Sequence, residues 1–581
     1  MLAITAGSPT LDDKSLAENL PVAMYKRVIE AGRQLPAFIV CALALAAQAQ
    51  TPPDAGRLLD SIRPTPALPA PGKSPLPTEA ERPALSAPDS TRILVKGFRF
   101  SGLQSMAEDE LMPLVQEGIG RELTLAEINA LVRKVTLHYR SRGLVLARAY
   151  LPAQDVKDGI IEIAVLEGRI GKVNVDNGSD IAIAIINNHL VTLVPNSPVE
   201  DRTLERSLLL LKDLPGVEVS STLKPGASVG TSDLDIRVQP TQRFSGSVDA
   251  DNFGNRYTGD TRLGLTLNYA NPLGRGDLLT LRGTASSGMD YARLGWQTPL
   301  GGDGLKAGAA WSDMRYRLEK DFANLHAHGT ASIGTLWLSY PLLRSQISNL
   351  SLQLSHDGKA LRDRVDSTST VTDKDIGVST LSLSGDRLDG LFGGGLTSAS
   401  LGYGFGKLRL DPVNAALDQA ATGHQTQGRY DKWSISLSRV QQLGESWSLL
   451  ASLSGQVAGK NLDSSEKFTL GGAQGVRAYP QGEASGDDAW LANLELRYSL
   501  PQWADLQAIA FHDVGEARIN HRPLATDIPN TRRIAGEGFG LQWIKSGDFA
   551  LKAHVAWRAT ARPVSDVDRA PRVWVQFAKY F

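Results

Sequence analysis

The sequence is poor in cysteine and has no long apolar run. Its 581 residues include one cysteine, Cys41, so the chain can form no internal disulfide and offers no cysteine-based zinc site. No run of about 18 consecutive apolar residues occurs, which argues against a membrane-spanning helix. A chain of this composition can cross a membrane only as a closed β-barrel, because lipid leaves the edges of an open sheet without hydrogen-bond partners.

The sequence also lacks the signals of nucleic-acid binding, nucleotide binding and catalysis. The formal net charge is −1, so there is no surplus of positive charge for a nucleic acid. Gly72-Lys73-Ser74 matches the end of a phosphate-binding loop, but Ala67 stands where that motif needs a glycine. His326 and His328 form the one close pair of histidines, and such a pair is more typical of an exposed loop than of a metal site. We therefore predict no nucleic-acid or nucleotide partner, no cofactor, no metal site and no catalytic residue.

One stretch, residues 471–488, is unusually rich in glycine. Its five glycines and one proline exclude a regular helix or strand interior, and it is too long for a tight hairpin turn. A solvated surface loop is the simplest interpretation. The order of its residues is nevertheless specific. Val476-Arg477-Ala478-Tyr479 stands in the middle, preceded by Gly471-Gly472 and followed by Gly482-Glu483 and Gly486-Asp487.

This pattern resembles the sixth extracellular loop of the two-partner secretion transporters, the TpsB proteins of the ShlB/FhaC/HecB type. They share a superfamily with the BamA insertase, whose commoner pattern has glycine where this chain has Ala478. The resemblance covers roughly residues 50–581. It implies a 16-stranded antiparallel transmembrane β-barrel preceded by two periplasmic α/β POTRA domains and an N-terminal plug helix.

The N-terminal residues predict export from the cytoplasm. Basic residues precede the apolar run 35–47, and Ala47-Gln48-Ala49 fits a signal-peptidase site. We predict a signal peptide over residues 1–49, with Met24 as an alternative start and a short buried helix as the alternative interpretation.

Residues 50–92 are expected to contain a short helix and then a linker rich in proline over 64–88. Asp54 is placed to cap the helix, and its apolar face is formed by Ala55, Leu58, Leu59 and Ile62. The resemblance implies that this helix plugs the barrel, and a frayed tail is the alternative.

Residues 93–168 and 169–241 each predict a small α/β unit. Thr124 and Glu127 form a capping box that opens a helix, which Gly143 ends. The second unit repeats the β-α-α-β-β plan of the first. The resemblance implies two POTRA domains that bind the exoprotein, as an added strand on a sheet edge. The alternative is that they are only spacers.

Residues 242–581 alternate apolar with small polar residues in short segments, as a barrel wall requires. Sixteen segments start near residues 244, 261, 277, 290, 304, 331, 349, 377, 395, 431, 446, 488, 505, 532, 548 and 572. We expect strands of about 9–11 residues. Eleven segments precede the glycine-rich stretch, which makes it the sixth outer loop if both termini are periplasmic. Phe581 ends the chain and resembles the signal that the barrel assembly machinery reads.

Strand thirteen carries Phe511-His512-Asp513. Phe511 and Asp513 share one face, which must be the inner one, because a charged Asp513 will not face lipid. Glu495 faces inward on the preceding strand and competes as a partner for Arg477. The resemblance implies that Arg477 pairs with Asp513 in a lock between loop and barrel, and a water-filled lumen is expected to weaken that pair.

Together these features predict an outer-membrane translocation pore of a Gram-negative bacterium. It would bind a cognate exoprotein of haemolysin, haemagglutinin or adhesin type at the POTRA domains and secrete it by two-partner secretion. A BamA-like insertase and a passive porin are the alternatives. An insertase usually carries more POTRA domains, and a porin needs none.

Overall fold

The computed structural model describes residues 52–62, 92–144, 147–156, 158–195, 201–228, 231–503 and 505–581. The predicted signal peptide over residues 1–49 and the predicted linker over 64–88 lie outside the described residues.

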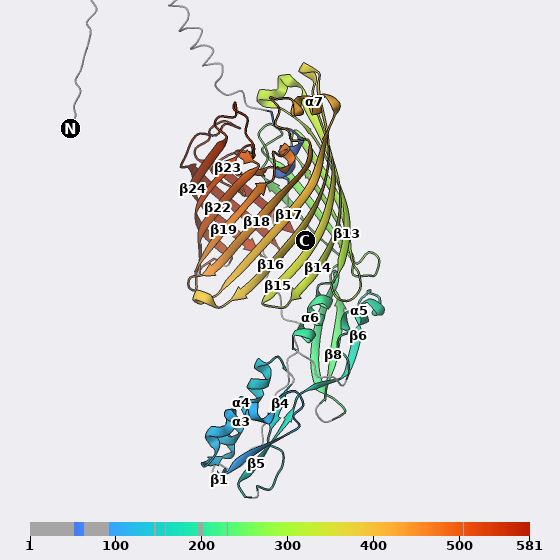
Figure 1. The fold of residues 1–581 in the computed structure, drawn as a ribbon, viewed down its shortest axis with the longest axis vertical. Coiled ribbons are helices and arrows are strands. Elements are labelled where there is room, and N and C mark those ends of the chain that lie inside the picture. The colour runs from blue at the N-terminus through green and yellow to red at the C-terminus, as the bar shows by residue number, and fades with distance from the viewer. Residues whose placement is uncertain are drawn as a thin grey trace, which may run out of the picture. The chain divides into compact units, whose positions relative to one another are not determined.

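Sixteen antiparallel strands close into one barrel, as the alternation of the sequence predicts (Figure 1). All sixteen predicted segments correspond to strands. The strands are β9 (Phe244–Asp251), β10 (Arg262–Ala270), β11 (Leu278–Ala285), β12 (Met289–Pro299), β13 (Lys306–Arg317), β14 (Ala327–Arg344), β15 (Ser348–Val365), β16 (Thr370–Asp389), β17 (Gly395–Leu410), β18 (Gly428–Gln442), β19 (Trp447–Ala458), β22 (Asp488–Ser499), β23 (Leu506–Arg518), β24 (Thr531–Lys545), β25 (Phe549–Arg558) and β26 (Arg572–Tyr580).

The predicted strand length is wrong for the middle of the barrel. β16 has 20 residues and β14 and β15 have 18 each, whereas crossing the hydrocarbon layer needs about 9–11. These strands pair with one another over their whole length, and the extra residues extend the wall beyond what the membrane requires.

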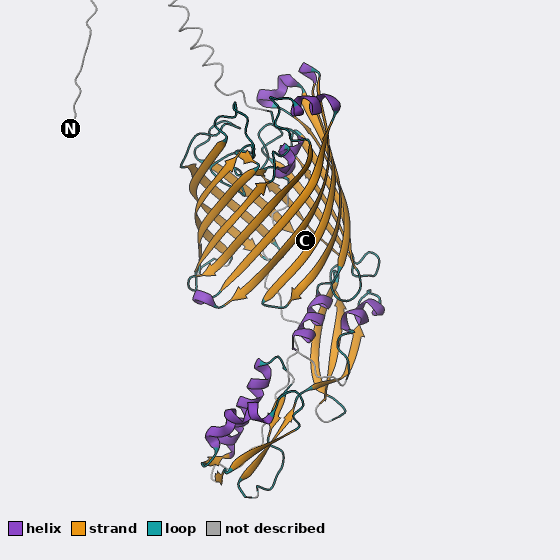
Figure 2. Ribbon diagram, viewed as in Figure 1, coloured by secondary structure: helices purple, strands orange, loops and turns teal. Residues whose placement is uncertain are grey.

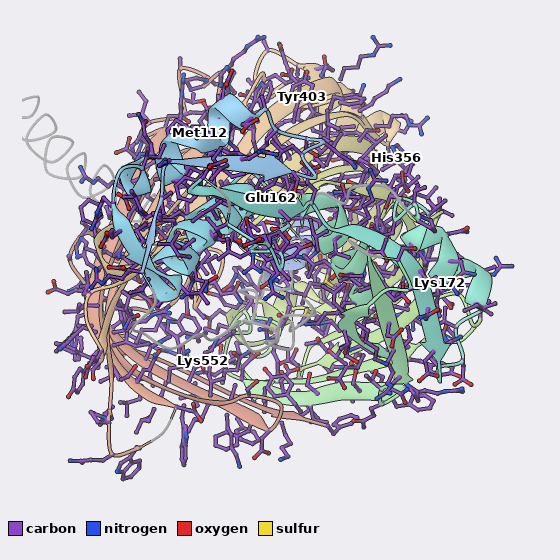
Figure 3. All side chains as sticks on the ribbon, turned by 90° about the horizontal axis from the view of Figure 1, so that it is seen from below. Met112, Glu162, Lys172, His356, Tyr403 and Lys552 are labelled. Carbon is purple, nitrogen blue, oxygen red and sulfur yellow. The ribbon has the colours of Figure 1, made fainter. Side chains whose placement is uncertain are left out.

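Side chains alternate between the two faces of the wall. On β10, Leu263, Leu265 and Leu267 are exposed on the outer face, where lipid suits them. Lys552 of β25 lies on the inner side, as the view from below shows (Figure 3). Among the described residues, no helix is long and apolar enough to span a membrane.

Two α/β units precede the barrel and share one sheet topology (Figure 2). In the first unit, the sheet order is β2-β5-β4; in the second it is β6-β8-β7. In the first sheet, β5 lies in the centre and pairs parallel with β2 and antiparallel with β4. In the second sheet, β8 lies in the centre and pairs parallel with β6 and antiparallel with β7. The predicted internal repeat is therefore confirmed.

The first unit contains β1 (Arg92–Leu94), β2 (Gly97–Ser101), α3 (Glu108–Val115), β3 (Glu122–Thr124), α4 (Leu125–Ser141), β4 (Arg148–Tyr150) and β5 (Ile160–Leu166). The second contains β6 (Arg169–Asn177), α5 (Ile183–Leu190), α6 (Asp201–Lys212), β7 (Val217–Pro225) and β8 (Thr231–Pro240). The capping box of Thr124 and Glu127 is present at the start of α4. Each unit has its own apolar core.

Helix α2 (Ala55–Ser61) packs inside the barrel. Asp54 caps it by accepting a hydrogen bond from the backbone N–H of Arg57. The face predicted to be apolar is buried against a cluster of inward-facing barrel residues, which includes Met314, Leu361, Ile376 and Leu408. Burial of this face against the wall holds the helix, since a helix of seven residues is marginal alone.

Candidate functional site

The glycine-rich stretch lies in the loop between β19 and β22. Two short strands, β20 (Phe468–Thr469) and β21 (Ser485–Gly486), pair and close its base. Gly472 has a φ of +133°, a conformation that favours glycine. A side chain at Gly471 would place its Cβ 2.6 Å from the Cβ of Glu483. The loop is thus folded on itself, and the glycines permit the close approach of its two arms.

Arg477 at the centre of this loop is bound by two carboxylates of the barrel wall. Its Nε and Nη2 donate to the two oxygens of Asp513 at 2.9 and 2.8 Å, and its backbone N–H donates to the same carboxylate at 3.1 Å. Its Nη1 donates to Glu495 at 2.7 Å. Arg477 is 4% exposed and Asp513 is fully buried. We call Arg477, Glu495 and Asp513 the loop–barrel lock.

The lock uses both of the acids that the sequence offered as competing partners. The guanidinium has donors on more than one edge, so one carboxylate can take the Nε edge while another takes Nη1. Glu495 is shared further with Arg497, at 2.6 Å. Both partners of the main pair are buried, so we now expect lumen water to weaken the pair less than the sequence alone suggests.

The register of two neighbouring strands sets the position of Asp513. Asn493 of β22 lies directly opposite Asp513 of β23. The Asn493 amide donates to Asp513 at 2.8 Å and to the carbonyl of Gly475 at 3.1 Å. Asn493 therefore joins the acid on the wall to the loop backbone just before the arginine.

Aromatic side chains surround the lock. The guanidinium carbon of Arg477 lies 3.5 Å from the centroid of the Phe511 ring, a stacking arrangement that adds to the ion pairs. The indole of Trp574 on β26 donates to the carbonyl of Arg477 at 2.6 Å. Val476 and Tyr479 are fully buried, and the Tyr479 hydroxyl donates to the carbonyl of Ala561 at 2.6 Å.

Ala478 fits because the wall has a glycine opposite it. A Cβ added at Gly536 of β24 would lie 2.3 Å from the Cβ of Ala478. The departure from the commoner glycine at this motif position is therefore accommodated by a small residue on the barrel side.

The two acids that follow the motif bind backbone N–H groups of other loops. Glu483 is fully buried, accepts from the N–H of Ser565 at 2.9 Å and pairs with Arg532. Asp487 is also fully buried and accepts from the N–H of His521 at 2.8 Å. Gly482 has a φ of +90° and turns the chain just before Glu483.

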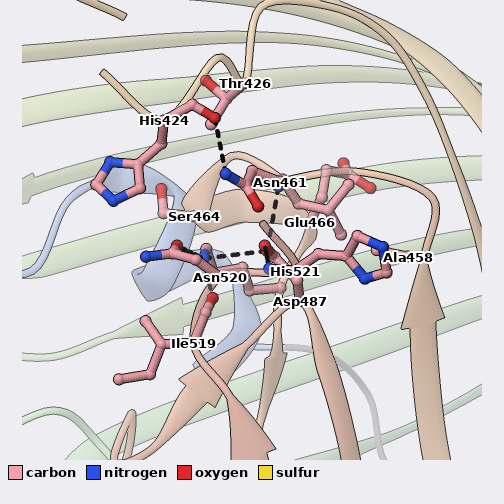
Figure 4. A network of polar contacts seen from close by, with 12 residues as sticks. His424, Thr426, Ala458, Asn461, Ser464, Glu466, Asp487, Ile519, Asn520 and His521 are labelled. Atoms are coloured by element: carbon pink, nitrogen blue, oxygen red, sulfur yellow. Dashed lines mark hydrogen bonds and ion pairs between the residues drawn. The ribbon is translucent and has the colours of Figure 1, made fainter. Parts of the chain in front are cut away.

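A second network ties the first part of the loop to its neighbours (Figure 4). Asn461 donates to the carbonyl of His424 at 2.8 Å, and the N–H of Leu462 donates to Asp487 at 3.1 Å. Glu466 pairs with Lys359 at 2.6 Å and with Lys432 at 3.0 Å. Burial alone would raise the pKa of Glu466, but the two lysines lower it to about 2.

The site is an anchoring arrangement. Its charged groups are bound to one another, and the part of the chain that the structure describes shows no cluster of three or more metal-ligating side chains. The sequence pattern identified Arg477, Asp513 and Glu495 but missed Asn493, Trp574 and Gly536. The one signal for Gly536 is a glycine inside a strand, which often marks close approach of another backbone.

Comparison with known proteins identifies the family. The model of the haemolysin secretion/activation protein ShlB/FhaC/HecB matches residues 230–543, more than half of the chain. The chain belongs to this family. A second model, the POTRA domain of ShlB type, matches residues 93–168. The predicted family and the first predicted POTRA domain are thereby confirmed.

Individual relatives agree with this assignment. The heme/hemopexin transporter protein HuxB of Haemophilus influenzae strain 86-028NP is 28% identical over 488 residues, which cover 82% of this chain and 85% of that protein. The outer membrane transporter CdiB of Dickeya dadantii is 25% identical over 430 residues, covering 72% and 74%. The solved structure of CdiB from Escherichia coli is similar in fold, with a TM-score of 0.65, 21% identity and coverage of 87% and 94%.

Membership of this family favours a secretion transporter over an insertase or a porin. The protein is an outer-membrane translocation pore of two-partner secretion. Phe581, the predicted insertion signal, pairs through its backbone with Gly246 of β9 at 2.9 and 3.1 Å, so it continues the seam between the first and last strands.

Proposed function

We propose that the pore receives one large exoprotein in the periplasm, at the two α/β units over residues 93–240, and releases it at the cell surface. The lock holds the sixth loop inside the lumen while the chain passes. One observation carries this proposal. The same chain contains a closed barrel, whose sixth loop is bound to the wall, and two sheets with open edges. The outer membrane surrounds the barrel, and the barrel assembly machinery inserts it by reading the C-terminal strand and Phe581.

The second sheet has longer edge strands than the first and offers the more extended surface for docking a peptide. Among the described strands, β6 and β7 each neighbour β8 alone and each extend over nine residues, but the β6–β8 pairing is interrupted between Ile170 and Val173, whereas β7 pairs with β8 without interruption. An extended peptide can add to such an edge through main-chain hydrogen bonds. In the first unit the corresponding edge strand, β4, has three residues. We therefore assign the main exoprotein contact to β7.

Helix α2 occupies the lumen in the resting state that we propose. Asp54 pairs with Lys374 of β16 at 3.1 Å and accepts from Ser464 at 2.5 Å, and the N–H of Ala55 donates to Asp363 of β15 at 3.0 Å. The attraction of Lys374 and the Ser464 hydrogen bond keep the pKa of Asp54 below its ordinary value although burial opposes this. The helix must leave these partners before a polypeptide can pass.

Cysteine cross-linking tests the docking edge directly. Since the chain has one cysteine, Cys41, in the predicted signal peptide, Thr222→Cys on β7 would introduce a single thiol into the mature protein. We expect it to form disulfides with cysteines placed along the secretion domain of the exoprotein. Asn187→Cys, exposed on α5 of the same unit, is the matched control and should stay uncross-linked. Equal cross-linking of both variants would remove β7 as the docking edge.

Deletion and proteolysis test the roles of the two regions. A variant that lacks residues 93–168 should insert its barrel and secrete nothing, whereas normal secretion would make the unit a spacer. Protease added to intact cells should spare residues 93–240, and cleavage there without permeabilisation would contradict a periplasmic location.

A further inference from the structure

A polar cavity of about 240 Å³ lies where three loop segments meet beside the first and last strands. Its walls come from residues 252–260 after β9, from Pro480 and Gln481 of the sixth loop, and from residues 565–574 before and within β26. The segments after β9 and before β26 lie at the end of the barrel opposite to Phe244, where β9 begins. With residues 93–240 in the periplasm, this end faces outward.

Three arginines, Arg256, Arg569 and Arg572, line this arginine cavity, against two acids, Asp260 and Asp566. The lining therefore carries one more positive than negative charge. Arg572 and Trp574 lie on the inward face of β26, because Val573 between them is exposed on the outer face. Arg572 is the most deeply buried of the three, whereas the Arg569 side chain is 46% exposed and Arg256 also pairs with Asp321 outside the lining.

The ion pairs of these arginines with the protein are long, although Arg256 and Arg572 also lie 5.9 and 5.8 Å from the ring centroids of Tyr257 and Trp574. Arg572 is 6% exposed, yet its bonds to Asp566 measure 3.4 Å and its bond to the carbonyl of Val567 measures 3.3 Å. Arg256 reaches Asp566 only at 3.6 Å and Asp321 at 3.3 Å. Arg569 reaches Asp260 at 3.5 Å. All of these distances exceed the 2.7–2.9 Å that is usual for guanidinium–carboxylate hydrogen bonds, by about half an ångström.

Two of these side chains also keep a buried donor without a partner. The Nε atoms of Arg256 and Arg572 are buried and make no hydrogen bond to any described residue. A buried donor left without an acceptor destabilises the folded state. Both side chains line the arginine cavity, so its walls hold two guanidinium groups whose bonding to the protein is incomplete.

We propose that the arginine cavity binds a phosphate group. Three guanidinium groups around one small cavity suit an anion with several acceptor oxygens. A phosphate has more acceptor oxygens than a carboxylate and spreads them in three dimensions, so it can bond several arginines around one cavity. The phosphate can come from free inorganic phosphate or from a lipid with a phosphorylated sugar headgroup, and both present the same oxygens.

Binding would join loops that the chain itself connects weakly at this point. β26 and β9 pair over five residues, Gln576–Tyr580 with Asp251–Ser247, and the Asn252 side chain continues the seam by bonding Val573 and Val575 of β26 at 2.9 and 2.8 Å. A phosphate held by Arg256 on one side and by Arg572 on the other would bridge the seam at its outer end.

Calorimetric titration of the purified full chain in detergent micelles with inorganic phosphate tests the site. We expect Arg256→Gln to weaken phosphate binding about tenfold or more, since a hydrogen bond to a charged group contributes about 1.5–3 kcal/mol. Asp566→Asn removes the competing carboxylate and should strengthen binding. Arg562→Gln is the matched control, because Arg562 lies in the same loop, is 79% exposed and is outside the cavity lining. Retention of the SDS-resistant folded band shows that each variant keeps its barrel.

Two vesicle-binding experiments distinguish a lipid headgroup from free phosphate. Flotation with phosphatidylcholine vesicles that carry a phosphorylated glycolipid, compared with its dephosphorylated form, reports a lipid headgroup. Preference for the phosphorylated lipid, lost in Arg256→Gln, supports the lipid source, and binding of inorganic phosphate alone supports the free source. Equal phosphate affinity in the wild type, Arg256→Gln and Arg562→Gln overturns the proposal. Binding of an acidic peptide with no binding of either phosphate form overturns it in favour of a polypeptide ligand.

Discussion

The chain binds Arg477 of the loop–barrel lock very differently from the arginines of the arginine cavity. In the loop–barrel lock, Arg477 makes four hydrogen bonds of 2.7–3.1 Å to two carboxylates. In the arginine cavity, Arg256 and Arg572 reach their carboxylates at 3.3–3.6 Å and keep an Nε donor without a partner among the described residues. The sixth loop carries Arg477 and also lines the arginine cavity with Pro480 and Gln481, so the two places are neighbours that differ in how completely their arginines are hydrogen-bonded.

The completeness of hydrogen bonding distinguishes an arginine that holds the structure together from one that can bind a ligand. A charge pair that is buried and fully bonded can hold a loop in place, because separating it would leave both charges without partners. An arginine that is buried and incompletely bonded can form further hydrogen bonds when an anion binds beside it. The comparison predicts that damage to the lock affects the fold and transport together, whereas damage to the cavity spares both.

The largest effect is expected from breaking the lock. Arg477→Ala leaves Asp513 buried without its partner, which typically costs about 3–5 kcal/mol. We expect loss of secretion and a lower free energy of unfolding in urea titrations of the detergent-solubilised protein. Asp513→Ala should give the same defect, and the double variant should be no worse than either single one, as expected for a coupled pair.

Additive defects in Arg477→Ala and Asp513→Ala would show that the two residues act independently. Glu495→Gln is the graded control. Glu495 makes one bond to Arg477 while Asp513 makes three, so its loss should cost less than that of Asp513.

A smaller effect is expected from crowding the lock. Gly536→Ala would bring a methyl group 2.3 Å from the Cβ of Ala478, and overpacking of this kind costs about 1–3 kcal/mol. Ala478→Gly restores the commoner motif residue and should rescue Gly536→Ala in the same urea titration. Failure of the rescue would mean that the wall, and not the loop, limits this contact.

Much of this architecture could be predicted from the sequence, because period-2 alternation and an even strand count depend on local pattern alone. The extra length of β16 could not, since the pattern of a strand does not show where the membrane ends. The alternation of the strands places both acids of the lock on the inner face. That Arg477 binds both of them depends on the path of the sixth loop into the lumen, which the sequence does not show. Asn493 reaches the lock because the strand register sets it opposite Asp513, and Trp574 reaches it because the barrel closes. A local sequence pattern predicts neither.

Glu466 tests whether lysine pairs in the lumen behave like the arginine lock. Its pKa of about 2 lies below the ordinary 4.5, so its stabilisation is present above pH 4.5 and is lost as the pH falls through about 2. Protease accessibility of residues 459–470 should therefore stay constant from pH 8 to about pH 5. Glu466→Gln should raise accessibility at neutral pH, at a cost of about 1–3 kcal/mol. Equal protection in Glu466→Gln would show that Lys359 and Lys432 do not hold this segment.

The smallest effect is expected in the arginine cavity. Arg256→Gln removes two long ion pairs, of 3.3 and 3.6 Å, so its cost should lie well below that of losing the 2.7–2.9 Å bonds of the lock. In phosphate-free buffer its free energy of unfolding should match that of the wild type, and secretion should continue. Saturating phosphate should then stabilise the wild type and not the variant, because a ligand that binds only the folded state raises its stability. If Arg256→Gln in phosphate-free buffer lowered the free energy of unfolding as much as Arg477→Ala does, Arg256 would be a structural residue like Arg477. The distinction between the lock and the arginine cavity would then fail.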